Sequence, residues 1–330
     1  MVGARTSDAL SDALVAAGAL IENSIYLWPM AVPPPMVLCE FGAASEVAPL
    51  AGGQGSAWRA GDLVLKPLDM SLNALEWQAD VLAAMSPDGF RVAAPLRSRV
   101  GALVVEGWTA WPALTGAHAT RWDDIIAVGG RFHDALANVE RPAALLDART
   151  DVWADADRIA WGEMSGGDRE AVSEVARLLS ARRAVHAPSQ LVHGDLSGNV
   201  LFADGLAPAV TDFSPYWRPK GFASAVVAAD AVLFHHADIE LLSRVVDARD
   251  GPQLLIRALL FRLLAHPDPA EHADVYRPGV DYVTSAREFD AARGVAVAFA
   301  CESEPAAIAS ASMEQRGTSR YRAPCSGDPG

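Results

Sequence analysis

The pattern of apolar and polar positions divides the chain into a strand-rich part and a helix-rich part. Between residues 36 and about 106, short alternating runs predict strands, among them GDLVLKPLD, FRVAAPL and GALVVEGWTAWPAL. One segment of this part, 72–85, has helical spacing, and Ser71 precedes it as a suitable N-cap. Further along, Ala- and Leu-rich stretches predict helices at 121–138, 168–183, 224–247, 253–264 and 284–301, interrupted only by the strand–loop block 190–213.

Changes in composition mark the predicted domain boundaries. Residues 1–35 form an N-terminal extension with an amphipathic helix at roughly 9–24, and the prolines 33–35 end it. Residues 36–110 then form a smaller, strand-rich lobe, and 111–301 form a larger helical lobe. The last segment, 302–330, is rich in Ser, Gly, Pro and Ala and is predicted to be disordered.

Composition and charge narrow the class of protein. With 330 residues and 51% hydrophobic positions, the chain can bury one large core or two lobes. Its net charge of −14 argues against a nucleic-acid-binding surface and suits a cationic or neutral small molecule. Cys39, Cys301 and Cys325 form no C-x-x-C pair, which fits a reducing cytoplasm without disulfides or a zinc site. The apolar stretch near the start contains Asp12 and Glu22 and follows no basic run, so we expect neither a membrane span nor a signal peptide.

The stretch LVHGDLSGNVLFADG concentrates side chains that could carry chemistry. Asp195 and Asn199 lie in a loop between two apolar runs, and a hairpin turn at 204–205 would return Asp212 close to the loop that holds His193. Two acids and one amide are hard oxygen ligands, of the kind and number that Mg²⁺ takes beside phosphates and water. The alternative is a loop in which Asx turns satisfy the backbone, but three such residues in this order favour a functional site.

The segment HGDLSGN followed by TDFS resembles the catalytic and metal-binding segments of the aminoglycoside phosphotransferase-like family, relatives of the protein kinases, and within it an actinobacterial branch. The resemblance implies an α+β, two-lobed, protein-kinase-like fold with a small β-rich N-lobe and a larger helical C-lobe. It also implies ATP and Mg²⁺ as cofactors and phosphoryl transfer to a small-molecule hydroxyl. It makes Asp195, with His193 beside it, catalytic, and Asn199 and Asp212 the magnesium ligands.

The glycines and the lysine that a nucleotide site needs occur earlier in the chain. Gly52, Gly53, Gly55 and Ser56 lie in a small-residue loop, and Lys66 follows on the next predicted strand. Glycines let backbone amides approach phosphates closely, and a lysine can neutralise the phosphate charge. The chain has only two lysines, so a lysine here is informative. A P-loop is excluded, because its lysine directly follows the last glycine and a helix comes next.

Two further contacts follow from the resemblance. Glu76, in the helix after Lys66, would pair with that lysine, although a solvated helix acid is the alternative. In VVEGWTAWPAL, backbone groups around Glu106–Trp108 would bind adenine.

Two departures from the kinase pattern keep other functions open. Asn199 follows Asp195 by four residues, where kinases have five, so a pseudokinase-like nucleotide-binding regulator is the main alternative. Ser214 stands after Asp212–Phe213 where glycine is usual, which argues against a mobile activation segment. A dinucleotide-binding protein that uses GGQG would need alternating strands and helices after the glycines, and the hairpin-rich pattern argues against it.

The acceptor stays open at this stage. The acidic charge favours a cationic acceptor such as an aminoglycoside, while sugars, amino alcohols and amino acids fit the lobe equally well. Oligomeric state is not indicated. In the apolar run 224–247, His235 and His236 are predicted to pack, and Asp230 either supports the catalytic loop or caps the core.

Overall fold

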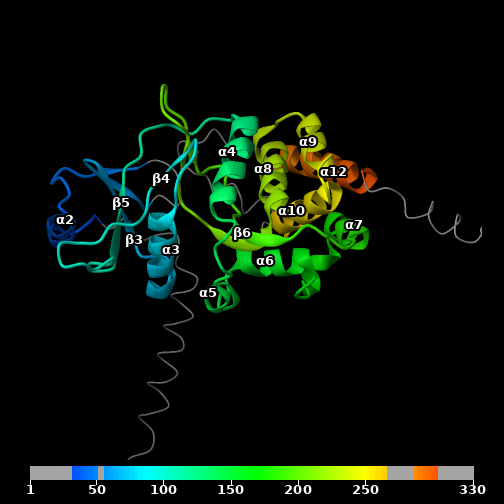
Figure 1. Cartoon of the computed structure of the whole chain (residues 1–330). Helices are drawn as coiled ribbons and strands as arrows, with labels where there is room; N and C mark the ends of the chain where they lie inside the picture. The colour runs from blue at the N-terminus through cyan, green and yellow to red at the C-terminus, as the bar shows by residue number, and fades with distance from the viewer. Residues whose placement is uncertain (1–31, 51–55, 266–285, 304–330) are drawn as a thin grey trace, which may run out of the picture. The chain divides into compact units, whose positions relative to one another are not determined.

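The computed structural model describes residues 32–50, 56–265 and 286–303 of the chain (Figure 1). These residues form two compact units. The first contains the described residues up to His118 and the segment Leu201–Thr211, and the second contains Ala119–Val200 and the described residues from Asp212 on. The helix predicted at 9–24 lies outside the described residues, as does nearly all of the predicted tail 302–330. No helix within the described ranges is long and apolar enough to cross a membrane.

A four-stranded antiparallel sheet organises the first unit, with the order β1-β2-β3-β5. Alternation along the strands gives the sheet two apolar faces. Leu65 on β3 and Ala110 on β5 are fully buried on one face together with Val37 of α2, while Trp111 packs on the other face. The elements are α2 (Pro35–Phe41), β1 (Ala48–Pro49), β2 (Trp58–Ala60), β3 (Leu63–Pro67) and β5 (Trp108–Pro112).

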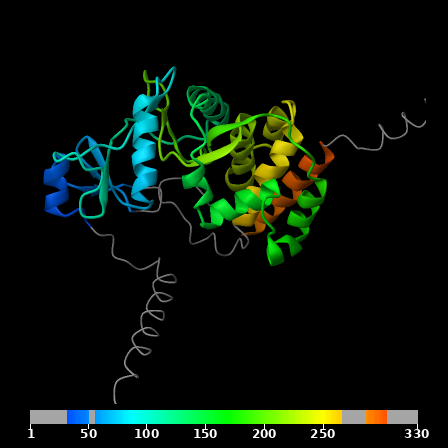
Figure 2. The same cartoon turned by 60° about the horizontal axis from the view of Figure 1, so that its bottom comes forward.

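The second helix of this unit, α3 (Leu72–Ala84), covers the opposite face of the sheet (cyan in Figure 2). It begins as predicted, since the Ser71 hydroxyl accepts a hydrogen bond from the Ala74 amide at 3.3 Å. Leu75 and Ala79, one helical turn apart, are buried against Leu103. The α2 helix was not predicted, because the run of prolines there suggests a break; proline in the first turn of a helix costs no hydrogen bond.

A second, three-stranded sheet of this unit joins segments far apart in the sequence. β4 (Arg91–Val92) pairs in parallel with β8 (Ala209–Val210), which neighbours β7 (Val200–Leu201). The Arg91 guanidinium also donates hydrogen bonds to the carbonyls of Ala207 and Thr115, both at 2.7 Å. The domain boundaries therefore differ from those predicted. Position 110 falls inside β5, the division lies at His118, and the hairpin 201–211 belongs with the first unit.

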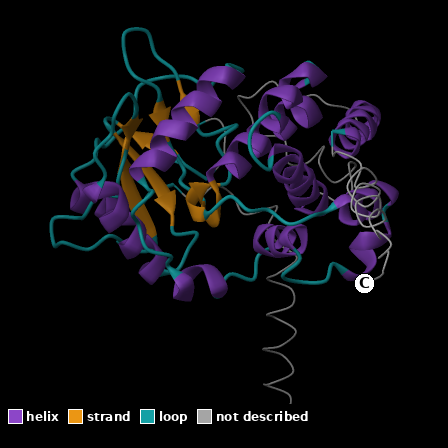
Figure 3. Ribbon diagram, turned by 45° about the vertical axis from the view of Figure 1, so that its right-hand side comes forward, coloured by secondary structure: helices purple, strands orange, loops and turns teal. Residues whose placement is uncertain are grey.

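Helices make up most of the second unit (purple in Figure 3). α8 (Lys220–His235) and α10 (Gly251–Ala265) are buried on nearly every side and pack against each other, which their almost continuous apolar sequences explain. α4 and α12 pack on α8, and α6 packs on α10. The other helical elements are α4 (Trp122–Ala135), α5 (Ala143–Asp147), α6 (Val152–Trp161), η1 (Gly167–Ala171), α7 (Ser173–Ala181), η2 (Ile239–Leu242), α9 (Ser243–Val246) and α12 (Ala286–Glu302).

The helix predictions differ from the structure at three places. The helix predicted at 168–183 is broken at Val172 into the 3₁₀ turn η1 and the helix α7. The helix predicted at 224–247 is interrupted at His236, whose φ of 55° places it in the left-handed region, and a 3₁₀ turn and the short α9 follow. The helix α6 was not predicted, although its sequence is amphipathic. Asp151 caps it by accepting a hydrogen bond from the Ala154 amide at 3.0 Å.

A two-stranded antiparallel ladder positions the candidate site within the second unit. β6 (Ser189–His193) pairs with β9 (Pro215–Pro219), and His193 lies opposite Pro215. β9 was not predicted, because its two prolines are unusual for a strand and are tolerated only at its ends or at an edge. Since the strands are antiparallel, the loop that follows β6 and the residues that precede β9 lie at the same end. This ladder brings the HGD and TDFS segments together.

Candidate active site

The loop after β6 is tied to the residues before β9 by hydrogen bonds. The Gly194 amide donates to the Ser214 carbonyl at 3.0 Å. The Nδ1 atom of His193 accepts from the Asp195 amide at 3.1 Å and from the Ser214 amide at 3.5 Å. The His193 ring is fully buried. The catalytic role predicted for His193 is therefore corrected, because a fully buried ring bonded to backbone amides cannot touch a substrate; it positions the loop.

A second buried histidine supports the first. The Nε2 atom of His133, on α4, accepts a hydrogen bond from the His193 amide at 3.1 Å. Burial, aided by the charges of His193 and Lys220, lowers the pKa of His133 to about 3. The rings of Phe132 and Phe213 pack edge-on or tilted against His193, with centroids 6.1 and 5.7 Å away. An uncharged His133 and packed aromatic rings therefore lie beneath the loop.

The carboxylate of Asp195 is held on both of its oxygens. Its Oδ1 accepts from the Arg262 guanidinium at 2.9 Å, and its Oδ2 accepts from the Asn199 amide nitrogen at 3.1 Å. The Asn199 side chain also donates to the Asp195 carbonyl at 2.6 Å. The Asp195 side chain is still 30% exposed. The four-residue spacing thus forms a closed, hydrogen-bonded loop that presents a partly exposed carboxylate.

The loop is also held by two charged residues from the core helices. Asp230 on α8 accepts a hydrogen bond from the Ser197 hydroxyl at 2.7 Å, which favours its predicted support of the loop over capping within the core. Arg262 on α10 binds Asp230 and Asp195 together. Burial opposes the charge of the Arg262 guanidinium, but the charges of Asp230 and Asp195 outweigh it and raise its pKa.

Sequence reasoning missed Arg262, although a signal was present. A charged residue within the apolar run LLIRALLFRLLA must be buried, and a buried charge requires a partner. Asp230 stands in a second apolar run of the same kind. Matching these two would have predicted the pair.

Asp212 lies at the same end of the β6–β9 ladder as Asp195. It is exposed and has a φ of 47°, a left-handed conformation that aspartate tolerates better than most residues and that often marks a functional site. Carboxylate and amide oxygens at Asp212 and Asn199 fit Mg²⁺, which needs one or two protein ligands beside phosphates and water. No cluster of three or more His, Cys, Asp or Glu side chains suited to a metal occurs in the described part of the chain.

The predicted nucleotide residues lie in the first unit. Lys66 is half-buried on β3, and Ser56 is exposed just before β2. Gly52, Gly53 and Gly55 lie outside the described residues, but the base of their loop is closed by a hydrogen bond from the Leu50 amide to the Ala57 carbonyl at 2.9 Å. Glu76 lies exposed on α3, and its pairing with Lys66 stays a prediction.

The backbone groups predicted to contact adenine lie in a tight turn in which several of them bond to the protein itself. Glu106 and Gly107, with φ of 47° and 77°, form a two-residue turn, and Val105 and Trp108 exchange hydrogen bonds of 2.9 and 2.8 Å across it. The Gly107 carbonyl accepts from the Leu68 amide at 2.7 Å. The segment is therefore a hairpin turn, and adenine contacts by the remaining backbone groups around Glu106–Trp108 stay a prediction.

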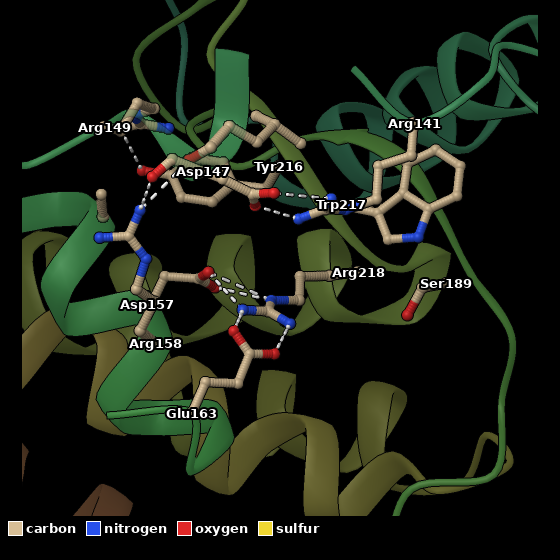
Figure 4. A pocket seen from close by; sticks show the side chains of 12 residues that line it. Arg141, Asp147, Arg149, Asp157, Arg158, Glu163, Ser189, Tyr216, Trp217 and Arg218 are labelled. Atoms are coloured by element: carbon tan, nitrogen blue, oxygen red, sulfur yellow. Dashed lines mark hydrogen bonds and ion pairs between the residues drawn. The ribbon is translucent and has the colours of Figure 1, made fainter. Parts of the chain in front are cut away.

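A network of ion pairs surrounds a cavity of about 240 Å³ beside β9 (Figure 4). Arg218 binds Asp157 and Glu163, each at 2.6 Å. Tyr216 accepts a hydrogen bond from Arg149 at 3.2 Å, and burial raises the pKa of its phenol to about 12. The Tyr216 ring is so close to Gly194 that a Cβ there would lie 2.4 Å from it. This network therefore fixes the wall against which the HGD loop packs.

Comparisons with known proteins identify the family. The family model of the phosphotransferase enzymes matches residues 46–216. Among solved structures, an aminoglycoside phosphotransferase from Alicyclobacillus acidocaldarius has 13% identity and a TM-score of 0.49 over 85% of this chain and 98% of its own. A choline/ethanolamine kinase family protein from Mesorhizobium loti has 18% identity and a TM-score of 0.46 over 80% of this chain and 90% of its own. No curated protein sequence matches.

The family model covers more than half of the chain, from the β-rich part to the end of the HGD and TDFS segments. The α+β class is confirmed, since the first unit is rich in strands and the second is mostly helical, and the family model confirms that the chain is a phosphotransferase. The actinobacterial branch stays a prediction. The chain belongs to the phosphotransferase enzyme family.

Proposed function

We propose that the chain transfers the γ-phosphoryl group of ATP, in the presence of Mg²⁺, to a hydroxyl group of a small molecule. One observation carries the proposal. The Asp195 carboxylate is partly exposed and fixed on both oxygens at the end of the ladder where Asp212 also lies. A phosphotransferase needs such a carboxylate to orient the acceptor hydroxyl and to receive its proton.

The other residues have roles that follow from their chemistry. Asn199, through its amide oxygen, and Asp212, through its carboxylate, would hold Mg²⁺, which supplies positive charge to the phosphates. Lys66 would neutralise the phosphates from β3, with Glu76 as its predicted partner, under the glycine loop. Catalysis of this kind is mostly positioning and charge neutralisation, so the rigidity of the Asp195 loop is central to it.

The acceptor is best sought among cationic hydroxyl compounds first. The chain carries a net charge of −14, which favours the approach of cations over anions. Aminoglycosides and amino alcohols are therefore the first candidates, followed by neutral sugars and amino acids. We also infer a cytoplasmic location, where ATP is available and the unpaired cysteines stay reduced.

The test is ADP release from Mg-ATP by the purified full chain, with a panel of aminoglycosides, amino alcohols, sugars and amino acids. At least one acceptor should raise the rate above that with water. Asp195→Asn should then lower kcat by about 100-fold or more, while ATP affinity changes little. Asp204→Asn, at an exposed hairpin turn, is the matched control and should leave kcat unchanged.

Unchanged turnover in Asp195→Asn would exclude the proposed base. If Mg-ATP raises the melting temperature of the chain but no acceptor increases ADP release, the chain is a nucleotide-binding regulator instead. The four-residue spacing of Asp195 and Asn199 is the observation that keeps this alternative open. Binding of NAD in place of ATP would contradict both functions.

A further inference from the structure

Arg262 connects the candidate catalytic carboxylate to the core of the second unit. It lies on α10, 67 residues after Asp195, and its side chain is only 4% exposed. Its Nη2 donates to Asp195 Oδ1 at 2.9 Å. Its Nε and Nη2 donate to the two oxygens of Asp230, both at 2.6 Å. One planar guanidinium therefore binds carboxylates from two separate segments.

Neighbouring groups fix the guanidinium in turn. It stacks over the ring of Phe261 at 5.0 Å and over that of Trp153 at 5.4 Å. Asp230 is buried and accepts a further hydrogen bond from Ser197, which belongs to the same loop as Asp195. The loop, α8 and α10 are thus closed into a ring of four polar side chains.

We propose that Arg262 is a positioning residue for phosphoryl transfer: it holds the Asp195 carboxylate in the orientation that receives the proton of the acceptor. This inference rests on the proposed function. A partly exposed aspartate can rotate about its side-chain bonds, and a displacement of about 1 Å in a reacting group can cost about 100-fold in rate. Because Arg262 is bonded to Asp230 as well, it cannot follow such a rotation.

A purely structural role of Arg262 would require fewer hydrogen bonds than the structure shows. Neutralising Asp230 in the core requires only the two bonds that Arg262 makes to that carboxylate, and these leave other N–H donors of the guanidinium available. The further bond, to Asp195, restrains the side chain of the loop through an arginine that is itself fixed in the core. Lysine cannot reproduce this, because its ammonium is a point charge without the planar fork.

The experiment compares Arg262→Met and Arg262→Lys with a matched control, Arg257→Met, in the full chain. Arg257 lies on the same helix and is also buried, but it bonds to Gln253 and to the Arg183 carbonyl and stacks over Trp161. Both methionine variants lose a buried arginine, so both should lower the thermal stability. The readout is ADP release from Mg-ATP, with the best acceptor of the panel or with water, as kcat and as KM for ATP.

The expected results separate positioning from stability. Arg262→Met should lower kcat by about 100-fold with KM for ATP within about threefold of wild type, because the orientation of Asp195 is lost while the residues proposed to bind ATP are unchanged. Arg262→Lys should recover part of kcat, since it keeps the charge but not the fork. Arg257→Met should keep kcat within about threefold. Equal kcat in the two methionine variants would overturn the proposal.

A second measurement does not depend on activity. Asp195→Asn and Arg262→Met are made singly and together, and urea unfolding gives the folding equilibrium constant of each. Without Arg262 the carboxylates of Asp195 and Asp230 repel each other. The effect of Asp195→Asn on the folding equilibrium constant should therefore be about tenfold more favourable in the Arg262→Met background than in the wild-type background. Additive effects would overturn the inferred contact. If the wild-type chain releases no ADP from Mg-ATP with any acceptor, the proposed function fails and the positioning role with it, while this cycle still decides whether Arg262 binds Asp195.

Discussion

His133 should make the stability of the second unit depend strongly on pH below neutrality. Its ring is buried, and its Nε2 accepts a hydrogen bond from the His193 amide. Its Nδ1 has no hydrogen-bond partner among the described residues. Protonation at Nε2 would replace an acceptor by a donor facing another donor, inside the core. The folded protein therefore keeps this ring neutral, with a pKa of about 3.

The magnitude follows from linkage between protonation and folding. In the unfolded chain His133 has its ordinary pKa of 6.5, so the unfolded state binds more protons than the folded state between pH 6.5 and 3. Stability is complete above pH 6.5 and falls as the pH is lowered. At pH 5, protonation of His133 in the unfolded state raises the unfolding equilibrium constant by a factor of about 30. The free energy of unfolding is therefore about 2 kcal/mol lower than at pH 7. Any folded pKa below about 4 gives nearly the same loss at pH 5.

The assay is urea unfolding of the wild type, His133→Gln and the control His186→Gln at pH 7 and pH 5. Glutamine at 133 offers an oxygen to the His193 amide and does not titrate. Its variant should lose about 2 kcal/mol less between the two pH values than the wild type does. The His186 side chain is 68% exposed, and an exposed ion pair such as the one it makes with Asp250 contributes little, so its variant should follow the wild type closely. If the wild type and His133→Gln lose equal stability, His133 is not held neutral and the reasoning fails.

Two other substitutions test the packing around the site. Gly194→Ala should destabilise the chain by about 1–3 kcal/mol in urea unfolding, because the new Cβ would lie 2.4 Å from the Tyr216 ring. The control Gly294→Ala has open space around the new Cβ and should leave the stability unchanged or raise it. If Gly194→Ala leaves the free energy of unfolding unchanged, the Tyr216 ring moves aside to make room for the new Cβ. Arg218→Met should cost about 3–5 kcal/mol, because it leaves the buried carboxylate of Asp157 without its partner. Unchanged melting of this variant would show that Asp157 finds another partner or takes up a proton at little cost.

The features that the sequence predicted depend on residues close together in the chain. Ser71 caps α3 as expected, since the cap and its acceptor amide lie three residues apart. The turn at 204–205 returns the chain so that β7 and β8 lie side by side. In each case the local pattern specifies the geometry without help from the rest of the fold.

The features that the sequence did not predict depend on partners far away in the chain. Arg262 finds Asp195 across 67 residues, and only the packing of α10 brings them together. The strand β9 forms in spite of two prolines, because β6 supplies its partner. The turn at Glu106–Gly107 is a different case, because its signal is local: the two residues stand within a run of alternating apolar and polar positions. The alternating pattern predicts a continuous strand there, although a glycine permits the left-handed conformation that a two-residue turn requires.

The distribution of buried charge links the stability of the second unit to its chemistry. Asp195, Asp230 and Arg262 together carry one excess negative charge at the edge of an apolar core. Replacing a buried ion pair by apolar residues is often neutral or stabilising, so stability alone does not explain why these charges are there. The proposed function does explain them, because Asp230 on α8 and Arg262 on α10 hold the Asp195 carboxylate in one orientation. That orientation is kept only while the two helices stay packed. Mutations that loosen the α8–α10 interface should therefore reduce turnover before they unfold the chain.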